Sequence, residues 1–137
     1  MTLTLRIMTP NQVVRDSEVQ EVILATISGR IGVLTDHAPP LAALDIGVLK
    51  IRVKRRWSVP ALMGGFAVVD ENGGVTILVD EADDAKDIEP RRAKADYLAA
   101  RDELARARGR KQEIGANSAM RRAKARLDAV TATTVPN

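Results

Sequence analysis

Apolar and polar residues alternate with a period of two in parts of the first ninety residues. Stretches 3–8 and 49–54 carry an apolar residue at every second position. Because successive side chains of a strand point to opposite faces, each stretch predicts a strand with one buried face and one exposed face. Further β-rich runs lie at 19–27, 31–34, 57–69 and 75–79.

Short turn signals separate these runs, namely Pro10-Asn11, Ser28-Gly29, residues 37–40, Asp45 and residues 72–74. The Asn72-Gly73 pair predicts a hairpin turn, because both residue types tolerate positive φ. Many short strands with turns between them are typical of an antiparallel sandwich or barrel. The fold class predicted for this part of the chain is therefore all-β.

From residue 88 onwards the period becomes helical. Glu89-Pro90 places a proline where the first turn of a helix accepts it. Two apolar stripes follow, each with alternating spacings of four and three residues. A polar segment, 109–115, begins and ends with glycine and separates the two stripes. The first stripe is Ala93, Tyr97, Ala100, Leu104 and Ala107, and the second is Ala116, Met120, Ala123, Leu127 and Val130. We expect a sandwich over residues 1–87 and an antiparallel helical hairpin over 88–137. The seam is rich in alanine, so it buries little apolar area and the hairpin should leave its docking site readily.

The sign of the net charge changes near the same boundary. Residues 1–90 contain 9 Lys and Arg against 13 Asp and Glu, a net charge of −4, and residues 91–137 contain 12 against 5, a net charge of +7. The first residues lack the apolar run of a signal peptide. The longest uncharged stretch, 57–69, is shorter than the roughly 20 residues of a membrane-crossing helix. A soluble or peripheral protein is expected.

No residue pattern indicates catalysis or a bound metal. The chain has no cysteine and one histidine, His37, and no nucleophile or metal-binding motif accompanies that histidine. The acidic run 80–87 lacks the glycine and the distant glutamate of a calcium loop, so it predicts a solvated linker. Neither Gly64-Gly65 nor Gly73-Gly74 precedes a lysine and a hydroxyl, as a phosphate loop requires.

Seven fragments, in order along nearly the whole chain, resemble the epsilon subunit of chloroplast-type ATP synthases. They are Met1–Arg6, Thr9–Asn11, Asp16–Val19, Ser28–Leu34, His37–Pro39, Asp45–Gly47 and Ala61–Phe66. The resemblance implies a non-catalytic rotor protein with a flattened sandwich of about ten strands. It also implies a tail that can inhibit ATP hydrolysis. The location it implies is the stromal side of the chloroplast thylakoid membrane, or alternatively the cytoplasmic side of a cyanobacterial thylakoid, where the protein would be peripheral through its complex.

The resemblance also assigns partners to particular loops. Asp36 and His37 are expected to contact the gamma subunit, and Ser28, Gly29 and Arg30 to contact the ring of c subunits. The basic tail is expected to face acidic groups of the alpha/beta catalytic head. No cofactor is implied.

One segment resembles the ATP-binding motif of some bacterial epsilon subunits, with glutamate in place of aspartate. It runs from Ile88 through Glu89 to Arg92. A guanidinium can pair with phosphate, and Arg122 and Arg126, one turn apart, could close over it. Weak regulatory ATP binding and an ordinary helix start with solvated arginines both remain open.

The basic tail also allows a second class of function, a nucleic-acid-binding module. Twelve Lys and Arg between residues 91 and 126 could neutralise phosphates. Tyr97 is the one aromatic residue of the tail, however, so base stacking is nearly absent, and no nucleic-acid motif occurs. A protein partner is therefore favoured over a nucleic acid.

Overall fold

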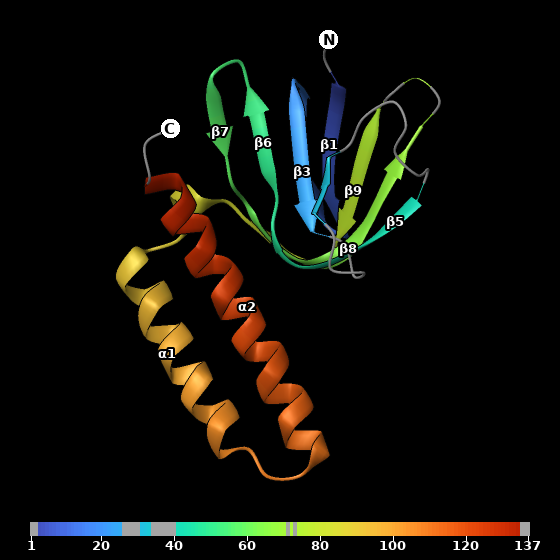
Figure 1. The fold of residues 1–137 in the computed structure, drawn as a ribbon. Helices are drawn as coiled ribbons and strands as arrows, with labels where there is room; N and C mark the ends of the chain where they lie inside the picture. The colour runs from blue at the N-terminus through green and yellow to red at the C-terminus, as the bar shows by residue number, and fades with distance from the viewer. Residues whose placement is uncertain (1–2, 26–30, 34–40, 71, 73, 135–137) are drawn as a thin grey trace.

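The computed structural model describes residues 3–25, 31–33, 41–70, 72 and 74–134. Figure 1 shows a head of curved β-strands and a tail of two helices that extends from one end of it. Within the described residues no helix is long and apolar enough to cross a membrane.

The head contains ten strands within the described residues. In chain order they are β1 (Leu3–Thr9), β2 (Gln12–Val19), β3 (Glu21–Ala25), β4 (Ile31–Val33), β5 (Leu41–Val48), β6 (Lys50–Val53), β7 (Arg56–Ser58), β8 (Ala61–Val69), β9 (Val75–Val79) and β10 (Ala82–Asp83).

These strands form two sheets. The six-stranded sheet has the order β10-β8-β9-β1-β2, with β5 also paired to β8, and the four-stranded sheet has the order β4-β3-β6-β7. All pairs are antiparallel except β1 with β9, which runs parallel from Leu5↔Val75 to Met8↔Leu78. The predicted sandwich of about ten strands followed by a helical pair is confirmed.

The main core lies between the two sheets, and all its buried members belong to strands except Leu49, which lies between β5 and β6. Period-two alternation places the apolar member of each strand on the inner face. The fully buried members include Leu5 and Ile7 of β1, Ile51 of β6 and Ile77 of β9. Among the described residues, no residue of a helix belongs to this core cluster.

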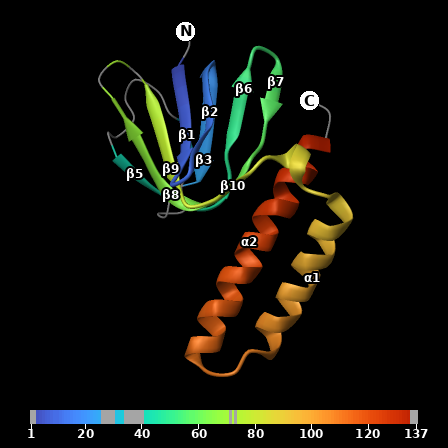
Figure 2. The same cartoon turned by 180° about the vertical axis from the view of Figure 1, so that it is seen from behind.

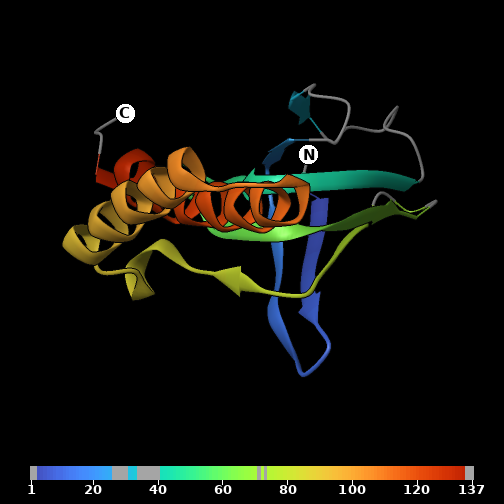
Figure 3. The same cartoon turned by 90° about the horizontal axis from the view of Figure 1, so that it is seen from below.

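Two glycines divide β8 into two parts. Gly64 has φ +83° and Gly65 has φ +143°, conformations that favour glycine over residues with a Cβ. A Cβ at Gly65 would clash with the Leu78 carbonyl oxygen and lie 2.8 Å from Val79 Cγ1. The part of β8 before the glycines, together with the C-terminal part of β5 that pairs with it, runs alongside the second helix (Figure 3).

The tail is an antiparallel pair of helices, α1 (Pro90–Arg106) and α2 (Arg110–Thr134). Glu89 caps α1, because its carboxylate accepts hydrogen bonds from the Arg91 and Arg92 amides at 3.2 and 2.8 Å. Gly109, with φ +85°, lies in the connection between the helices. A short 3-10 helix, η1 (Ala85–Asp87), precedes α1.

Two local expectations are wrong. Asp45, read as a turn signal, lies inside β5, where its backbone continues a strand. The acidic run 80–87 is more than a solvated linker, because it forms β10 and η1 and two of its carboxylates bind the tail. The predicted hairpin is present as β8 and β9, joined through residues 70–74, of which 71 and 73 lie outside the described residues.

Candidate functional site

The second helix docks on the bent ends of β5 and β8. Ala125 and Ala129 of α2 are buried against Val59, Ala61 and Met63 of the head, in a cluster that also includes Ala85. Ile46, Val48, Ile88 and Ala132 pack around it. We call these ten residues the docking cluster. Figure 1 shows that α2, and not α1, lies next to the strands. Small side chains permit this close approach, and they bury little apolar area.

Ion pairs flank the docking cluster. Arg126 of α2 lies 2.9 Å from Asp83 and 3.3 Å from Glu81, measured from Nε and Nη2 to the carboxylate oxygens. Arg121 donates a hydrogen bond to Asp45. These contacts join the basic tail to the acidic head, so the tail's charges meet carboxylates of the same chain in this conformation.

The pKa values of two groups reflect these contacts. The hydrogen bond from Arg121 lowers the pKa of the Asp45 carboxyl; burial acts against this, and a backbone hydrogen bond from Ile46 adds to it. Burial tends to lower the pKa of the Arg126 guanidinium, but its bonds with Asp83 and the charge of Glu81 outweigh burial and raise it. Both shifts favour the charged forms that hold the helix down.

The depressed pKa of Asp45 predicts a pH-dependent contribution to docking. It is fully present above the unfolded pKa, about 3.9, and is lost as pH falls through the lower folded pKa. At pH 7 the Asp45→Asn variant should therefore melt at a lower temperature than the wild type. The expected loss in free energy of unfolding is about 1 kcal/mol or less, since the pair is partly exposed. The difference should shrink as the pH falls below about 3.9 and disappear once Asp45 is protonated in the folded chain as well.

Thermal melts at pH 7 and at a series of lower pH values measure this effect. Asp16→Asn is the matched control, since its pair with Arg6 is longer, 3.7 Å, and lies away from the tail. A wild-type advantage that stays constant down to low pH would show that the charge of Asp45 does not hold α2.

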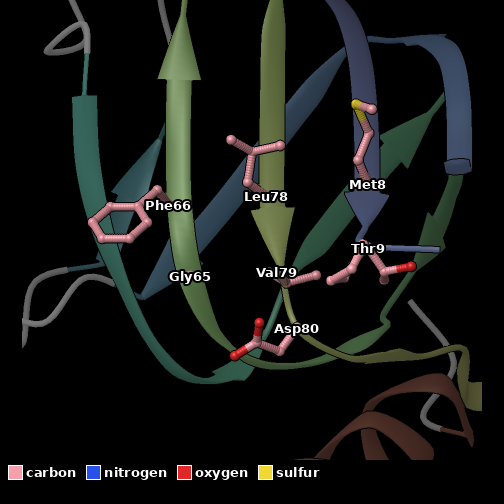
Figure 4. Close-up of a pocket in the computed structure, with 8 residues that line it drawn as sticks. Met8, Thr9, Gly65, Phe66, Leu78, Val79 and Asp80 are labelled. Carbon is pink, nitrogen blue, oxygen red and sulfur yellow. The ribbon is translucent and has the colours of Figure 1, made fainter. Parts of the chain in front are cut away.

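A second feature is an apolar row on the outer face of the six-stranded sheet. Strand register places its members side by side on five neighbouring strands: Val13, Met8, Leu78, Phe66 and Ala43. Val13, Leu78 and Phe66 are 53%, 43% and 51% exposed. Figure 4 shows Phe66, Leu78 and Met8 projecting from the same face of the sheet. We call this set the outer row.

A shallow pocket of about 370 Å³ adjoins the outer row. It lies beside Gly65, and Thr9, Val79 and Asp80 also line it (Figure 4). An exposed apolar row next to a hollow is typical of a protein contact surface.

The residues expected to contact partners come from two short segments of the sequence. Ser28, Gly29, Arg30, Asp36 and His37 are all outside the described residues. Their roles stay predictions. The outer row was missed at the sequence level, because only the strand register brings its five members together.

Four of the five residues expected to bind ATP have other contacts in this conformation. Glu89 caps α1, and Arg92 lies 3.7 Å from Asp96, one turn on. Arg126 is held by Asp83 and Glu81, Arg122 is exposed, and Ile88 packs beside the docking cluster. ATP binding stays a prediction. In the part of the chain that the structure describes, no group of three or more acidic, histidine or cysteine side chains could hold a metal ion.

Comparison with known proteins gives consistent matches. The family model "ATP synthase, Delta/Epsilon chain, beta-sandwich domain" matches residues 2–85. The ATP synthase epsilon chain, chloroplastic, of Huperzia lucidula is 61% identical over 97% of this chain and 96% of its own length. That of Anthoceros angustus is 55% identical over 99% and 98%.

Solved structures share the fold. A chain of the Euglena gracilis mitochondrial ATP synthase (OSCP/F1/c-ring) has a TM-score of 0.80 at 19% identity, over 95% of this chain and 81% of that one. A chain of the Tetrahymena thermophila mitochondrial ATP synthase central stalk/c-ring has a TM-score of 0.59 at 20% identity, over 98% of both chains. Since the family model covers most of the head and the relatives match nearly the full length, the chain belongs to the ATP synthase epsilon family.

Proposed function

We propose that the chain is the epsilon subunit of the central stalk of a proton-translocating ATP synthase, a non-catalytic rotor protein that links the gamma subunit to the c-ring. Membership of the epsilon family carries this proposal. The structural neighbours come from F1/c-ring and central-stalk assemblies, which supports the same setting. The chemistry of ATP then belongs to other subunits.

The outer row is the surface we assign to gamma. It is apolar, exposed and lies on a rigid sheet, so a partner can bury it at little entropic cost. Asp36 and His37 would extend this contact, and Ser28, Gly29 and Arg30 would face the c-ring, as the family resemblance implies. The row is separate from the docking cluster, so gamma can bind while the tail is docked.

The tail is proposed to inhibit ATP hydrolysis when it leaves the head. The observation that supports this is the weak docking surface, which consists of alanines and partly exposed ion pairs. In the released state Arg121 and Arg126 would be free to meet acidic groups of the alpha/beta head. The names of the relatives support a chloroplast location, and we propose the stromal side of the thylakoid membrane; the cytoplasmic side of a cyanobacterial thylakoid is the alternative.

A substitution in the outer row tests the gamma contact. Phe66→Asp should weaken binding to gamma by about 30-fold or more, because a buried aromatic anchor contributes about 2 kcal/mol. The head should stay folded, since exposed positions change stability by about 0.5 kcal/mol. Titration calorimetry with the cognate gamma subunit measures the affinity.

Ile114→Asp, which also replaces a large exposed apolar side chain with an acid but lies on α2, serves as the control and should bind gamma like the wild type. Equal affinities for the Phe66→Asp variant and the wild type would remove the outer row from the interface. A wild-type chain that does not bind gamma would refute the central-stalk role itself.

A further inference from the structure

Positive charge is concentrated in the β6–β7 hairpin of an otherwise acidic head. Five of the nine Lys and Arg between residues 1 and 90 lie within residues 50–56. One of them, Arg52, is compensated by Glu21 at 3.0 Å. The tip, with Lys54, Arg55 and Arg56, is exposed. Neither the main core nor the docking cluster uses these three side chains.

The tip lines an open hollow together with a strand of the other sheet. Arg15 of β2 joins Lys54, Arg55 and Arg56 around about 680 Å³, with Val53 and Ser58 completing the lining. Strands β2 and β7 are edges of the two sheets, and Figure 2 shows β2 beside the β6–β7 hairpin. Among the described residues none of the four cations forms an ion pair. We call this the basic hollow.

The turn that presents these cations is fixed in an unusual conformation. Lys54 has φ +59°, and it is the one residue other than glycine with positive φ among the described residues. Asparagine or glycine adopts this conformation at lower cost. The Lys54 amide donates to Gln20 Oε1, and Arg52 Nη1 donates to the Lys54 carbonyl oxygen at 3.1 Å. Two hydrogen bonds keep Lys54 in a backbone conformation that is unfavourable for lysine, which indicates that its positive charge contributes to function.

Cations also protect sheet edges from pairing with other chains, and β7 is an edge strand. That role requires neither a lysine at positive φ nor an arginine contributed by the opposite sheet. The basic hollow has both, so edge protection alone does not account for it.

We propose that the basic hollow is a binding site for a phosphate-bearing anion. Four uncompensated cations match a ligand with more than one negative charge, and the guanidinium forks of Arg15, Arg55 and Arg56 suit pairs of phosphate oxygens. Ser58 adds a hydroxyl donor. A soluble phosphate compound and a lipid headgroup share this chemistry. The proposal does not depend on the subunit's role in the rotor.

Titration of the full-length ¹⁵N-labelled chain with inorganic pyrophosphate, followed by NMR, tests the site. We expect the largest amide shifts at residues 53–58 and at Arg15. The Arg55→Gln/Arg56→Gln variant should bind about tenfold more weakly or worse. The matched control, Arg91→Gln/Lys94→Gln, removes the same charge from exposed positions of α1 and should bind like the wild type.

Lys54→Asn separates the charge from the turn. Because asparagine tolerates positive φ, this variant should melt at the same temperature as the wild type or at a higher one. Because it lacks the lysine charge, it should bind pyrophosphate several-fold more weakly than the wild type. Sedimentation with phosphatidylcholine vesicles, with and without phosphatidylglycerol, distinguishes the two sources. Selective binding to the anionic vesicles assigns a lipid headgroup, and pyrophosphate binding without it assigns a soluble ligand.

Two results would overturn the proposal. One is the absence of amide shifts at the hairpin with pyrophosphate together with no binding to the anionic vesicles. The other is an equal loss of binding in the two double variants, which would show a response to net charge alone.

Discussion

Replacing Gly65 with alanine should destabilise the head by about 3 kcal/mol or more, a large part of the stability of a domain of this size. The added Cβ would meet the Leu78 carbonyl oxygen, which is part of the backbone and cannot turn aside. The φ of +143° adds strain for any residue with a Cβ. Chemical denaturation of the full chain measures the loss.

Gly115→Ala is the matched control. A Cβ at Gly115 meets nothing within 4 Å, and the residue lies inside α2, where alanine favours the helix by about 1 kcal/mol over glycine. Glycine-to-alanine substitution should therefore stabilise the chain at position 115 in α2 and destabilise it at position 65 in β8. If the Gly65→Ala variant were as stable as the wild type, the close approach of β8 to β9 would not be what requires this glycine.

A fragment that ends at Glu89 should fold and bind gamma but lose its inhibition of ATP hydrolysis. Among the described residues the main core contains no helical residue, so the sandwich does not need the tail. Removal of α2 exposes Val59, Ala61 and Met63, which should lower stability by about 2 to 4 kcal/mol. Circular dichroism, gamma affinity and hydrolysis by the reassembled complex measure the three expected results.

A full-length variant with a loosened tail completes this test. Arg121→Gln/Arg126→Gln removes the pairs with Asp45, Asp83 and Glu81, so the released population should rise several-fold while both helices persist. This variant also lacks two of the arginines proposed to meet the catalytic head, so the Asp45→Asn variant, which keeps them, is tested beside it. An unfolded fragment would contradict the division at residue 88. A folded fragment that inhibits as well as the whole chain would remove the proposed role of the tail.

The sequence predicts elements well where one face of the element is apolar throughout. Stretches 3–8 and 49–54 alternate cleanly, and both form strands. In contrast, β2 was not predicted, because it is an edge strand whose middle residues, Arg15 to Glu18, are all polar. The strand β5 was also missed, since Asp45 interrupts its apolar residues and is balanced by an arginine 76 residues away.

The candidate sites depend on information that local patterns do not contain. Both helical stripes were visible, but Ala125 and Ala129 lie outside them, on a second face that only the docked structure identifies. The outer row depends on the register of five strands, and register is set by long-range pairing. A family resemblance identifies the function here, whereas the surfaces require the fold.

The parallel pairing of β1 with β9 has a consequence for how the chain folds. Leu5 pairs with Val75, so a loop of about seventy residues must close before the hydrogen bonds between β1 and β9 can form at the centre of the larger sheet. Such long-range pairing makes folding slow, whereas the two helices form from local contacts in microseconds. On a ribosome, β1 and β2 would wait as a lone hairpin until β9 emerges. The helices, made last, would then find their docking strands already assembled.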